Sequence, residues 1–289
     1  MDQVLGQARP VVKSAAATLR LDARTGIAIL SLALLLLLNA ISVATGPSEH
    51  VLAILVAVFV AALVSSVAGF AFSAICGALL APFVDSPVEA VQIMLVCSAV
   101  GQSYMVWCFR RDIDWRALVP FLVGAIPGLP LGLFLLFNAE PRLYGKALGL
   151  LLIVYALVML LRRPAVLRVQ HPALDAVAGF LGGITGGIAA FPGAPVTIWC
   201  GFKGWSKERQ RGLFQPFILV LQLAALALLA SGVVPAPHPV GLSLAGVVGL
   251  PAMLLGTGLG LTLFRRLSDR QFARVLNLFL VASGIALVL

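Results

Sequence analysis

The sequence predicts an all-α protein that crosses a membrane several times. Of its 289 residues, 61% are hydrophobic and only 11% are charged, a composition outside the range of soluble domains. Apolar runs long enough to cross a bilayer recur along the chain. Two further apolar stretches, 51–84 and 172–202, are too long for one crossing and are interrupted by glycine or proline. We therefore predict an inverted repeat of two units, each a re-entrant broken hairpin followed by three transmembrane helices, behind one extra N-terminal transmembrane helix.

The charged and reactive residues exclude several classes of protein. The net charge is +9, but lysine and arginine fall between the apolar runs, as they do in membrane proteins, so nucleic acid is not an expected partner. The four cysteines lack Cys-x-x-Cys spacing, and the three histidines make no metal-ligand pattern. No histidine lies in a span core to activate a serine nucleophile. We expect no metal, no cofactor and no enzymatic activity.

Residues 1–48 are expected to form a basic tail and a first transmembrane helix. The tail carries Arg9, Lys13, Arg20 and Arg24 before an apolar run over 26–45. A secretory signal peptide is the alternative, but a run of about 20 apolar residues is long enough to stay as a membrane span. Further full-length spans are expected near 88–108, 117–137, 144–161, 212–231, 240–264 and 272–289. Repeat 1 then covers 49–168 and repeat 2 covers 169–289, within one integrated membrane domain.

Both long stretches are expected to break. The first breaks near Gly69, and its two pieces reach about 25 and 20 Å, short of a hydrocarbon core of about 30 Å. The second holds five glycines and two prolines between residues 182 and 195, and both residue types disfavour a helix interior. We expect the helix to be interrupted there and to resume after Pro195, with the free N–H groups of residues 196–199 facing the middle of the membrane. Such a helix end attracts anions.

The distribution of positive charge favours one topology. If both long stretches turn back, 18 of the 20 Lys and Arg residues lie on the inner side, whereas 14 do if both cross once. Making only one stretch a hairpin splits the charge 10 to 10 or 6 to 14. Two re-entrant hairpins fit best, with the N-terminus in the cytoplasm and the C-terminus outside.

The two units match at an offset of about 120 residues. Ser86 corresponds to Ser206 and Gln102 to Gln222, while 140–143 matches 268–271 at an offset of 128. The first unit begins outside and the second inside, so the copies are inverted. Repeats of this kind place a substrate site where their broken segments meet near the bilayer midplane.

Several motifs around the two hairpins resemble those of a known family. In the first unit they are Ala-Gly-Phe-Ala-Phe at 68–72, Leu-Ala-Pro at 80–82, Ser-Pro-Val-Glu-Ala-Val at 86–91, Arg-Arg-Asp-Ile-Asp-Trp at 110–115 and Gly-Leu-Pro-Leu-Gly at 128–132. In the second they are a glycine-rich stretch at 178–187 and Pro-Gly-Ala-Pro at 192–195, where the family often has Gly or Pro in place of Ala194. Over roughly 50–289 the chain resembles the TauE/SafE family of sulfite and organosulfonate exporters. The resemblance implies a transporter in the cell inner membrane that exports sulfite, sulfoacetate or a related anion, although some relatives import or act on other organic acids.

The candidate anion-binding residues lie at the breaks and on the spans that follow them. They are Ser66, Gly69, Phe70, Phe72, Ser73, Gln102, Thr185, Gly186, Gly187, Pro192, Gly193, Ala194, Pro195, Thr197 and Gln222. Hydroxyls, amides and free backbone N–H groups all donate to oxyanions. The alternative for each hydroxyl is a bond to its own helix, and for each aromatic ring it is packing between helices. Lys203, Arg209 and Arg211 are expected to form a cytoplasmic vestibule, or else only to set the topology.

The carboxylates bear on the energy source. None of the 11 Asp and Glu residues lies near a span centre, and Asp175 and Glu89 come closest. Because proton-coupled transporters usually need an ionisable group inside the membrane, we expect no side chain here to carry a coupling proton. The membrane potential, worth about 2.3 kcal/mol per charge per 100 mV, is expected to favour export. A passive anion channel and an importer of another small organic anion stay open as alternatives, and so does the oligomeric state.

Overall fold

The computed structural model describes residues 51–68, 71–84, 86–111, 113–138, 171–205, 207–232 and 244–264, with isolated positions between 140 and 157 and at 281 and 285. The elements in this part of the chain are all helices. They are α3 (Val51–Ala68), α4 (Phe72–Leu80), α5 (Pro87–Phe109), α6 (Trp115–Asn138), α8 (Pro172–Ala189), α9 (Gly193–Phe202), α10 (Lys207–Ser231) and α11 (Leu244–Phe264). The predicted span at 26–45 lies outside the described residues, and those at 144–161 and 272–289 are described at only a few positions.

Four of the described helices are long and apolar enough to cross a membrane. They cover Pro87–Trp107, Trp115–Asn138, Pro172–Ala189 and Arg209–Ser231, and two shorter apolar helices cover Val51–Ser66 and Ala245–Gly260. The helices α5, α6, α10 and α11 match the predicted spans 88–108, 117–137, 212–231 and 240–264 within a few residues. The prediction of an all-helical, multi-pass membrane protein is confirmed.

Both long stretches are broken in the structure. The first consists of α3 and α4, which we call the first hairpin, and its break falls between Ala68 and Phe72. The second consists of α8 and α9, which we call the second hairpin, and its break falls at residues 190–192. Ala190 adopts a left-handed conformation with φ 51°, and the N–H of Phe191 closes the end of α8 by donating to the carbonyl of Thr185 at 3.1 Å. The chain therefore reverses direction sharply here.

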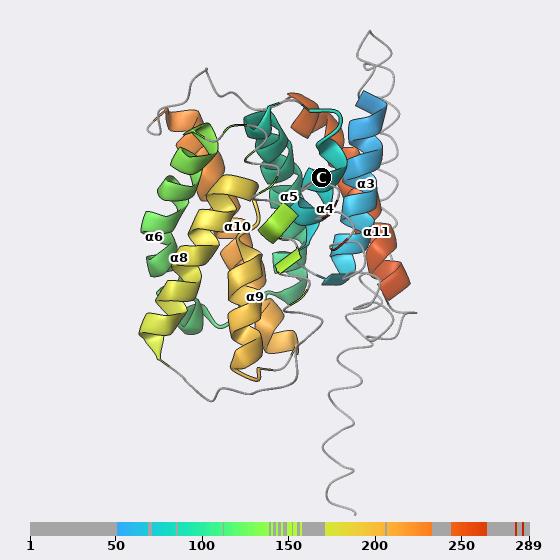
Figure 1. Cartoon of the computed structure of the whole chain (residues 1–289). Coiled ribbons are helices and arrows are strands. Elements are labelled where there is room, and N and C mark those ends of the chain that lie inside the picture. The colour runs from blue at the N-terminus through green and yellow to red at the C-terminus, as the bar shows by residue number, and fades with distance from the viewer. Residues whose placement is uncertain are drawn as a thin grey trace, which may run out of the picture.

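Each hairpin begins and ends at the same end of the molecule. In the second, the Lys203 ammonium at the end of α9 lies 2.7 Å from the Asp175 carboxylate in the first turn of α8. In the first, Leu52 near the start of α3 and Phe83 just after α4 line one groove. Figure 1 shows α3 running down from the upper edge and α8 running up from the lower edge, so the two hairpins start at opposite ends of the molecule.

Glycine has a different role in α8 from the one predicted. Gly179, Gly183 and Gly187 recur every fourth residue of α8 and face the backbone of α6, where Gly183 meets Gly128 and Gly187 meets Gly132. A Cβ on Gly183 would lie 2.8 Å from the carbonyl oxygen of Ala125, so the two backbones approach closely, as small residues allow in membrane helices. The chain breaks between residues 182 and 195, as predicted, but only at 190–192, so the glycines at 182–187 do not interrupt the helix. Helix α8 continues to Ala189 because contact with α6 offsets the low helix propensity of glycine.

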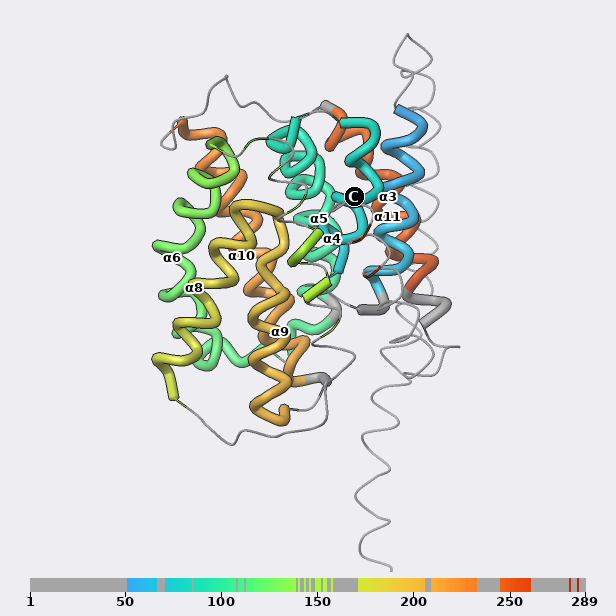
Figure 2. Tube along the Cα trace, viewed as in Figure 1, coloured from blue at the N-terminus to red at the C-terminus, as the bar shows by residue number. Residues whose placement is uncertain are grey.

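The core of the described region is a seam between α5 and α10. Figure 2 shows these helices at the centre, with α6 and α8 on one side and α3 and α11 on the other. Buried side chains from both hairpins join this seam in one apolar cluster, which includes an edge-to-face pair of Phe121 and Phe217 with ring centroids 6.3 Å apart. The two breaks are thereby held in the interior.

One end of the molecule collects basic residues. Arg209 at the start of α10 lies 3.9 Å from Asp114, which precedes α6, and Arg211 stacks 5.5 Å from the ring centroid of Phe109 at the end of α5. These contacts bring two basic segments together. Six basic residues of these segments define what we call the basic end, and they are Arg110, Arg111, Arg116, Lys203, Arg209 and Arg211.

Candidate anion site at the two breaks

The second break exposes helix donors one turn earlier than predicted. Helix α9 begins at Gly193, and no described side chain caps it. Since Pro195 has no N–H, the first donors outside the helix ladder are those of Gly193 and Ala194. The prediction of free N–H groups at 196–199 is wrong because α9 starts before Pro195, which is tolerated in the first turn of a helix.

The first break has a matching helix start. Helix α4 begins at Phe72, its N-cap residue is Ala71, and no described side chain caps it. The earliest bond into this turn runs from the N–H of Ile75 to the carbonyl of Ala71 at 3.2 Å. The N–H groups of Phe72, Ser73 and Ala74 therefore precede the ladder. Backbone donors held away from water are costly unless something accepts from them.

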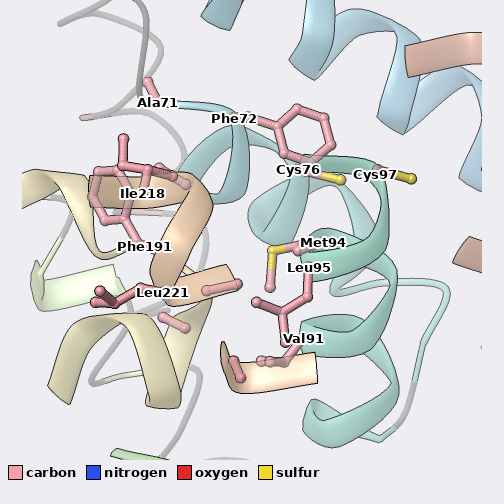
Figure 3. Packing of buried hydrophobic residues seen from close by; sticks show 14 of the residues in the cluster. Ala71, Phe72, Cys76, Val91, Met94, Leu95, Cys97, Phe191, Ile218 and Leu221 are labelled. Atoms are coloured by element: carbon pink, nitrogen blue, oxygen red, sulfur yellow. The ribbon is translucent and has the colours of Figure 1, made fainter. Parts of the chain in front are cut away.

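The two breaks share one buried environment. Ala71 is 0% exposed and Phe191 is 1% exposed, and both belong to the same apolar cluster. Figure 3 shows Ala71 and Phe72 from the first break, and Phe191 from the second, among side chains of α5 and α10. Helix α4 also contacts α8, so each hairpin touches the other. Two uncapped helix starts, with the positive poles of their dipoles, therefore point into the interior of one core.

The predicted glutamines lie on the central seam. Gln102 on α5 and Gln222 on α10 are 6% and 1% exposed, and Nε2 of Gln222 donates to Oγ of Ser98 at 2.6 Å. Within the described residues, Oε1 of Gln222 has no hydrogen-bond partner. A Cβ on Gly186 would lie 3.0 Å from Pro192 and 3.6 Å from Leu221. At Gly186, α8 therefore packs against both the second break and α10 of the seam.

Most of the predicted hydroxyl ligands bond to their own helices. Ser66 donates to the carbonyl of Leu63 at 3.0 Å, Thr185 to that of Leu181 at 3.1 Å and Thr197 to that of Gly193 at 2.6 Å. These three hydroxyls therefore satisfy the carbonyls of their own helices, which was the alternative to binding an anion. Ser73, 2% exposed, differs from them because it lies within the uncapped first turn of α4.

The other predicted site residues divide into three groups. Phe72, Pro192 and Gly193 lie at the breaks and are buried. Gly187 faces α6, and Ala194 and Pro195 help to line an outer apolar groove with Ile198. Gly69 and Phe70 lie outside the described residues.

Lys203, one of the three predicted vestibule residues, has a buried side chain at the basic end. Its side chain is only 4% exposed, and its ammonium pairs with Asp175, which also accepts from Nε1 of Trp199 at 2.6 Å. Arg209 is about half exposed, at 52%, beside Asp114. The three predicted vestibule residues share the basic end but differ in burial.

Three further buried polar residues escaped the sequence analysis. Ser98, Gln215 and Thr257 are at most 3% exposed. Ser98 precedes Gln102 by four residues and Gln215 precedes Gln222 by seven, so each pair shares a helix face. That spacing was the signal that could have found them. In the described part of the chain, no His, Cys, Asp or Glu residues cluster as a metal site would require.

Comparison with known proteins identifies the family of the chain. A search of curated proteins and a search of solved structures each found no match. A family model described as Sulfite exporter TauE/SafE matches residues 53–287, which include both breaks and the α5–α10 seam. The family consists of transporters and not enzymes. The chain therefore belongs to the TauE/SafE family of membrane transporters.

Proposed function

We propose that the protein exports a small sulfur-containing oxyanion, such as sulfite, sulfoacetate or a related organosulfonate, from the cytoplasm. The observation that carries this proposal is the pair of uncapped helix starts, α4 and α9, within one buried core. The anion binds between them, where backbone N–H groups and the helix dipoles replace its hydration shell. Ser73, Gln102 and Gln222 supply further donors. Family membership supports the choice of substrate class.

The inverted repeat is part of the proposal, and matched contacts support it. A Cβ on Gly128 would strike the carbonyl oxygen of Phe180, and a Cβ on Gly256 would lie 2.5 Å from that of Phe59. The two glycines are 128 residues apart and their partners are 121 apart. Gly132 with Ile184, and Gly260 with Leu63, repeat the match with the same two offsets. We infer that 49–168 and 169–289 are two inverted copies, with their hairpins re-entrant in the membrane.

The basic end is proposed to face the cytoplasm. Basic residues concentrate on the cytoplasmic side of membrane proteins, and six of them gather at this end in the structure. This orientation puts the N-terminus in the cytoplasm and the C-terminus outside, in the cell inner membrane. The second hairpin then opens toward the cytoplasm and the first toward the outside.

Burial at the breaks favours a carrier over a channel. Ala71, Phe191 and Gln222 are each at most 1% exposed, so an anion reaches them only after one end of the protein opens. Binding by amides and dipoles at the breaks, with no lysine or arginine among the fully buried polar residues of the described region, is expected to be weak enough for release. The membrane potential supplies about 2.3 kcal/mol per charge per 100 mV for an anion leaving an inside-negative cell.

Efflux from proteoliposomes tests the proposal. Purified protein in vesicles loaded with sulfite should give saturable efflux that an imposed inside-negative potential accelerates, and external unlabelled sulfite should exchange with labelled internal sulfite. Protein-free vesicles carrying the same potential serve as the control. Efflux that neither saturates nor exchanges would indicate the channel alternative, and no flux of sulfite, sulfoacetate or another organosulfonate would refute export.

The same vesicles test the absence of proton coupling. Asp175 is paired with Lys203, so replacing it alone would leave a buried charge without its partner. The informative variants are Glu89→Gln and the double variant Asp175→Asn/Lys203→Met. At saturating sulfite, both should retain potential-driven efflux with no accompanying pH change inside the vesicle. Loss of potential-driven flux in either variant would show that a carboxylate takes part in coupling.

A further inference from the structure

A buried ion pair in an aromatic cage lies at the open end of the second hairpin. The ammonium of Lys203 contacts the carboxylate of Asp175 at 2.7 Å. It also lies 4.7, 5.7 and 5.9 Å from the ring centroids of Trp205, Phe121 and Trp199. We call these five residues the Lys203 cluster. They come from α6, α8, α9 and the loop before α10, so the cluster ties the base of the hairpin to its neighbours.

The donors of this cluster are arranged as an oxyanion site would require. Nζ of Lys203 lies 2.5 and 2.7 Å from the two carboxylate oxygens of Asp175, and the nearer oxygen also accepts from Nε1 of Trp199 at 2.6 Å. Charge-assisted bonds of this kind are how proteins hold carboxylate and sulfur oxyanions alike. The cluster is thus an anion site whose occupant is a side chain of the protein itself.

A further donor in the cluster is unused. Nε1 of Trp205 is buried and has no hydrogen-bond partner within the described part of the chain. Such a group costs stability unless a ligand accepts from it. The two oxygens of the Asp175 carboxylate are engaged by Lys203 and Trp199, whereas a sulfite or sulfonate group brings three oxygens. A sulfur oxyanion therefore fits this set of donors more completely than the carboxylate does.

An exposed arginine adjoins the cluster. The guanidinium of Arg209, whose side chain is 52% exposed, stacks 4.3 Å from the ring centroid of Trp205. The ammonium of Lys203 lies 4.7 Å from the centroid of the same ring, and the Lys203 side chain is 4% exposed. Positive charge therefore continues from the surface to the buried ammonium, which raises the local concentration of anions at this end.

We propose that the Lys203 cluster is a loading site, at which an incoming sulfur oxyanion exchanges with the Asp175 carboxylate on Lys203 and Trp199. This inference rests on the proposed export function and extends it. With no anion present, Asp175 occupies the donors and holds the base of the second hairpin closed. When an anion arrives, it takes over the donors, frees Asp175 and loosens that base. Asp175 thus competes with the anion for Lys203 and Trp199, which weakens anion binding and allows release toward the breaks.

Opposite changes in apparent affinity test the loading site. In Asp175→Asn, the amide oxygen still accepts from Trp199 but no longer competes as a charge, so the apparent KM for sulfite presented at the basic end should fall by at least about fivefold. In Asp175→Asn/Lys203→Met the cation is gone, and the KM should rise above that of the unaltered protein. The double variant replaces the whole buried ion pair by neutral groups, which folds commonly tolerate, whereas Asp175→Asn alone leaves the Lys203 ammonium without its partner. The thermal midpoint of each variant measures this cost.

Tryptophan fluorescence gives a readout that does not depend on transport. Trp199 and Trp205 border the exchanged carboxylate, so a sulfite titration of the purified protein should change their emission, at lower concentrations for Asp175→Asn than for the unaltered protein. Asp114→Asn is the matched control, since it makes the same chemical change at the exposed carboxylate beside Arg209, and Asn still caps a helix. It should leave both the KM and the titration unchanged.

The outcomes separate the two proposals. If unaltered protein transports sulfite but both cluster variants keep its KM, or both raise it together with a lowered thermal midpoint, the cluster is only structural and the export proposal stands. If the unaltered protein transports no sulfur oxyanion, the export proposal fails and the loading site fails with it.

Discussion

The two hairpins share a course through the molecule but differ at their open ends. In the second hairpin, Asp175 and Lys203 close that end with a buried ion pair. The positions 121 residues earlier, in the first hairpin, are Ile54 and Pro82. What the hairpins have in common is the break and the uncapped helix start that follows it. If the proposed function holds, this comparison predicts that anion binding at the breaks depends on backbone, whereas control of access depends on side chains and differs between the two ends.

The hairpins also differ in how closely they are held. The second packs against α6 through three glycines on each helix, whereas the first packs against α11 with glycine at the contact on α11 only. On α3 the facing residues include Phe59, Ala62 and Leu63. The second hairpin therefore has less freedom to adjust to an added atom. This difference leads to the largest expected effect.

Alanine at the glycine contacts should destabilise the second hairpin more than the first. In Gly128→Ala the new methyl meets the backbone of α8, and we expect a loss of about 3 kcal/mol or a failure to fold. In Gly256→Ala the new methyl meets the carbonyl oxygen of Phe59 at 2.5 Å and the Cβ of Ala62 at 2.7 Å. About 1–3 kcal/mol is expected, because the facing helix has no glycine packed as closely. Thermal midpoints in detergent measure both.

Gly101→Ala is the matched control for these two variants. Its new methyl would meet the end of the flexible side chain of Met253, which can move aside, and alanine favours the helix by up to about 1 kcal/mol. We expect little change in its midpoint. If Gly101→Ala lost as much as Gly128→Ala, close backbone packing would not be what makes these glycines necessary.

A fixed negative charge at the first break should block transport without unfolding the protein. Ser73→Asp places a carboxylate in the uncapped turn of α4, where the helix pole stabilises it and where it competes with the anion. We expect efflux to fall by about 100-fold, because the coupled loss of binding is of the order of a few kcal/mol. Ser73→Asn has nearly the same size and no charge, so it should keep most of the activity. Equal efflux rates in the two variants would show that the anion does not bind at the first break.

Loss of the seam amides should weaken binding to a similar extent in both repeats. Gln102→Leu and Gln222→Leu each remove one amide donor, and the apparent KM should rise about three- to tenfold in each. Gln222→Leu also leaves Ser98 without its 2.6 Å partner, which should cost about 1 kcal/mol of stability. A KM change confined to one of the two variants would argue against equivalent roles for the repeats.

The exposed ion pair at the basic end should matter least for stability. Arg209 and Asp114 are 3.9 Å apart and about half exposed, and pairs of this kind contribute about 0–1 kcal/mol. Arg209→Ala should therefore shift the thermal midpoint very little. A shift as large as that of Gly256→Ala would show that this pair, and not only the Lys203 cluster, holds the second hairpin at its base.

Hydropathy and turn residues predict much of the fold. The spans of α5, α6, α10 and α11 follow from apolar runs, and both breaks fall within stretches that are too long for one crossing. The extent of the second break could not be predicted from helix propensity, because Gly183 and Gly187 are stabilised by contact with α6, a helix that lies about 50 residues away in the sequence. Glycine at every fourth position of both helices was the available signal.

The side-chain contacts of the site were less accessible to sequence reasoning. Ser73 and Gln222 could be chosen because they lie near a break or at matching repeat positions. The pairing of Asp175 with Lys203 joins residues 28 apart, and only the reversal of the chain at Ala190 brings them together. Whether a hydroxyl such as that of Thr197 donates to its own helix or to a ligand depends on its rotamer, which sequence does not specify.

Anion density at the breaks tests the central claim most directly. Selenite has the geometry of sulfite, and its selenium atom gives an anomalous signal in crystals of the purified protein. The account predicts a peak between the first turns of α4 and α9, with its oxygens about 2.7–3.2 Å from N–H groups of residues 72–74 and 193–194. Anomalous density that avoids both helix starts, under conditions where selenite inhibits sulfite efflux, would contradict it.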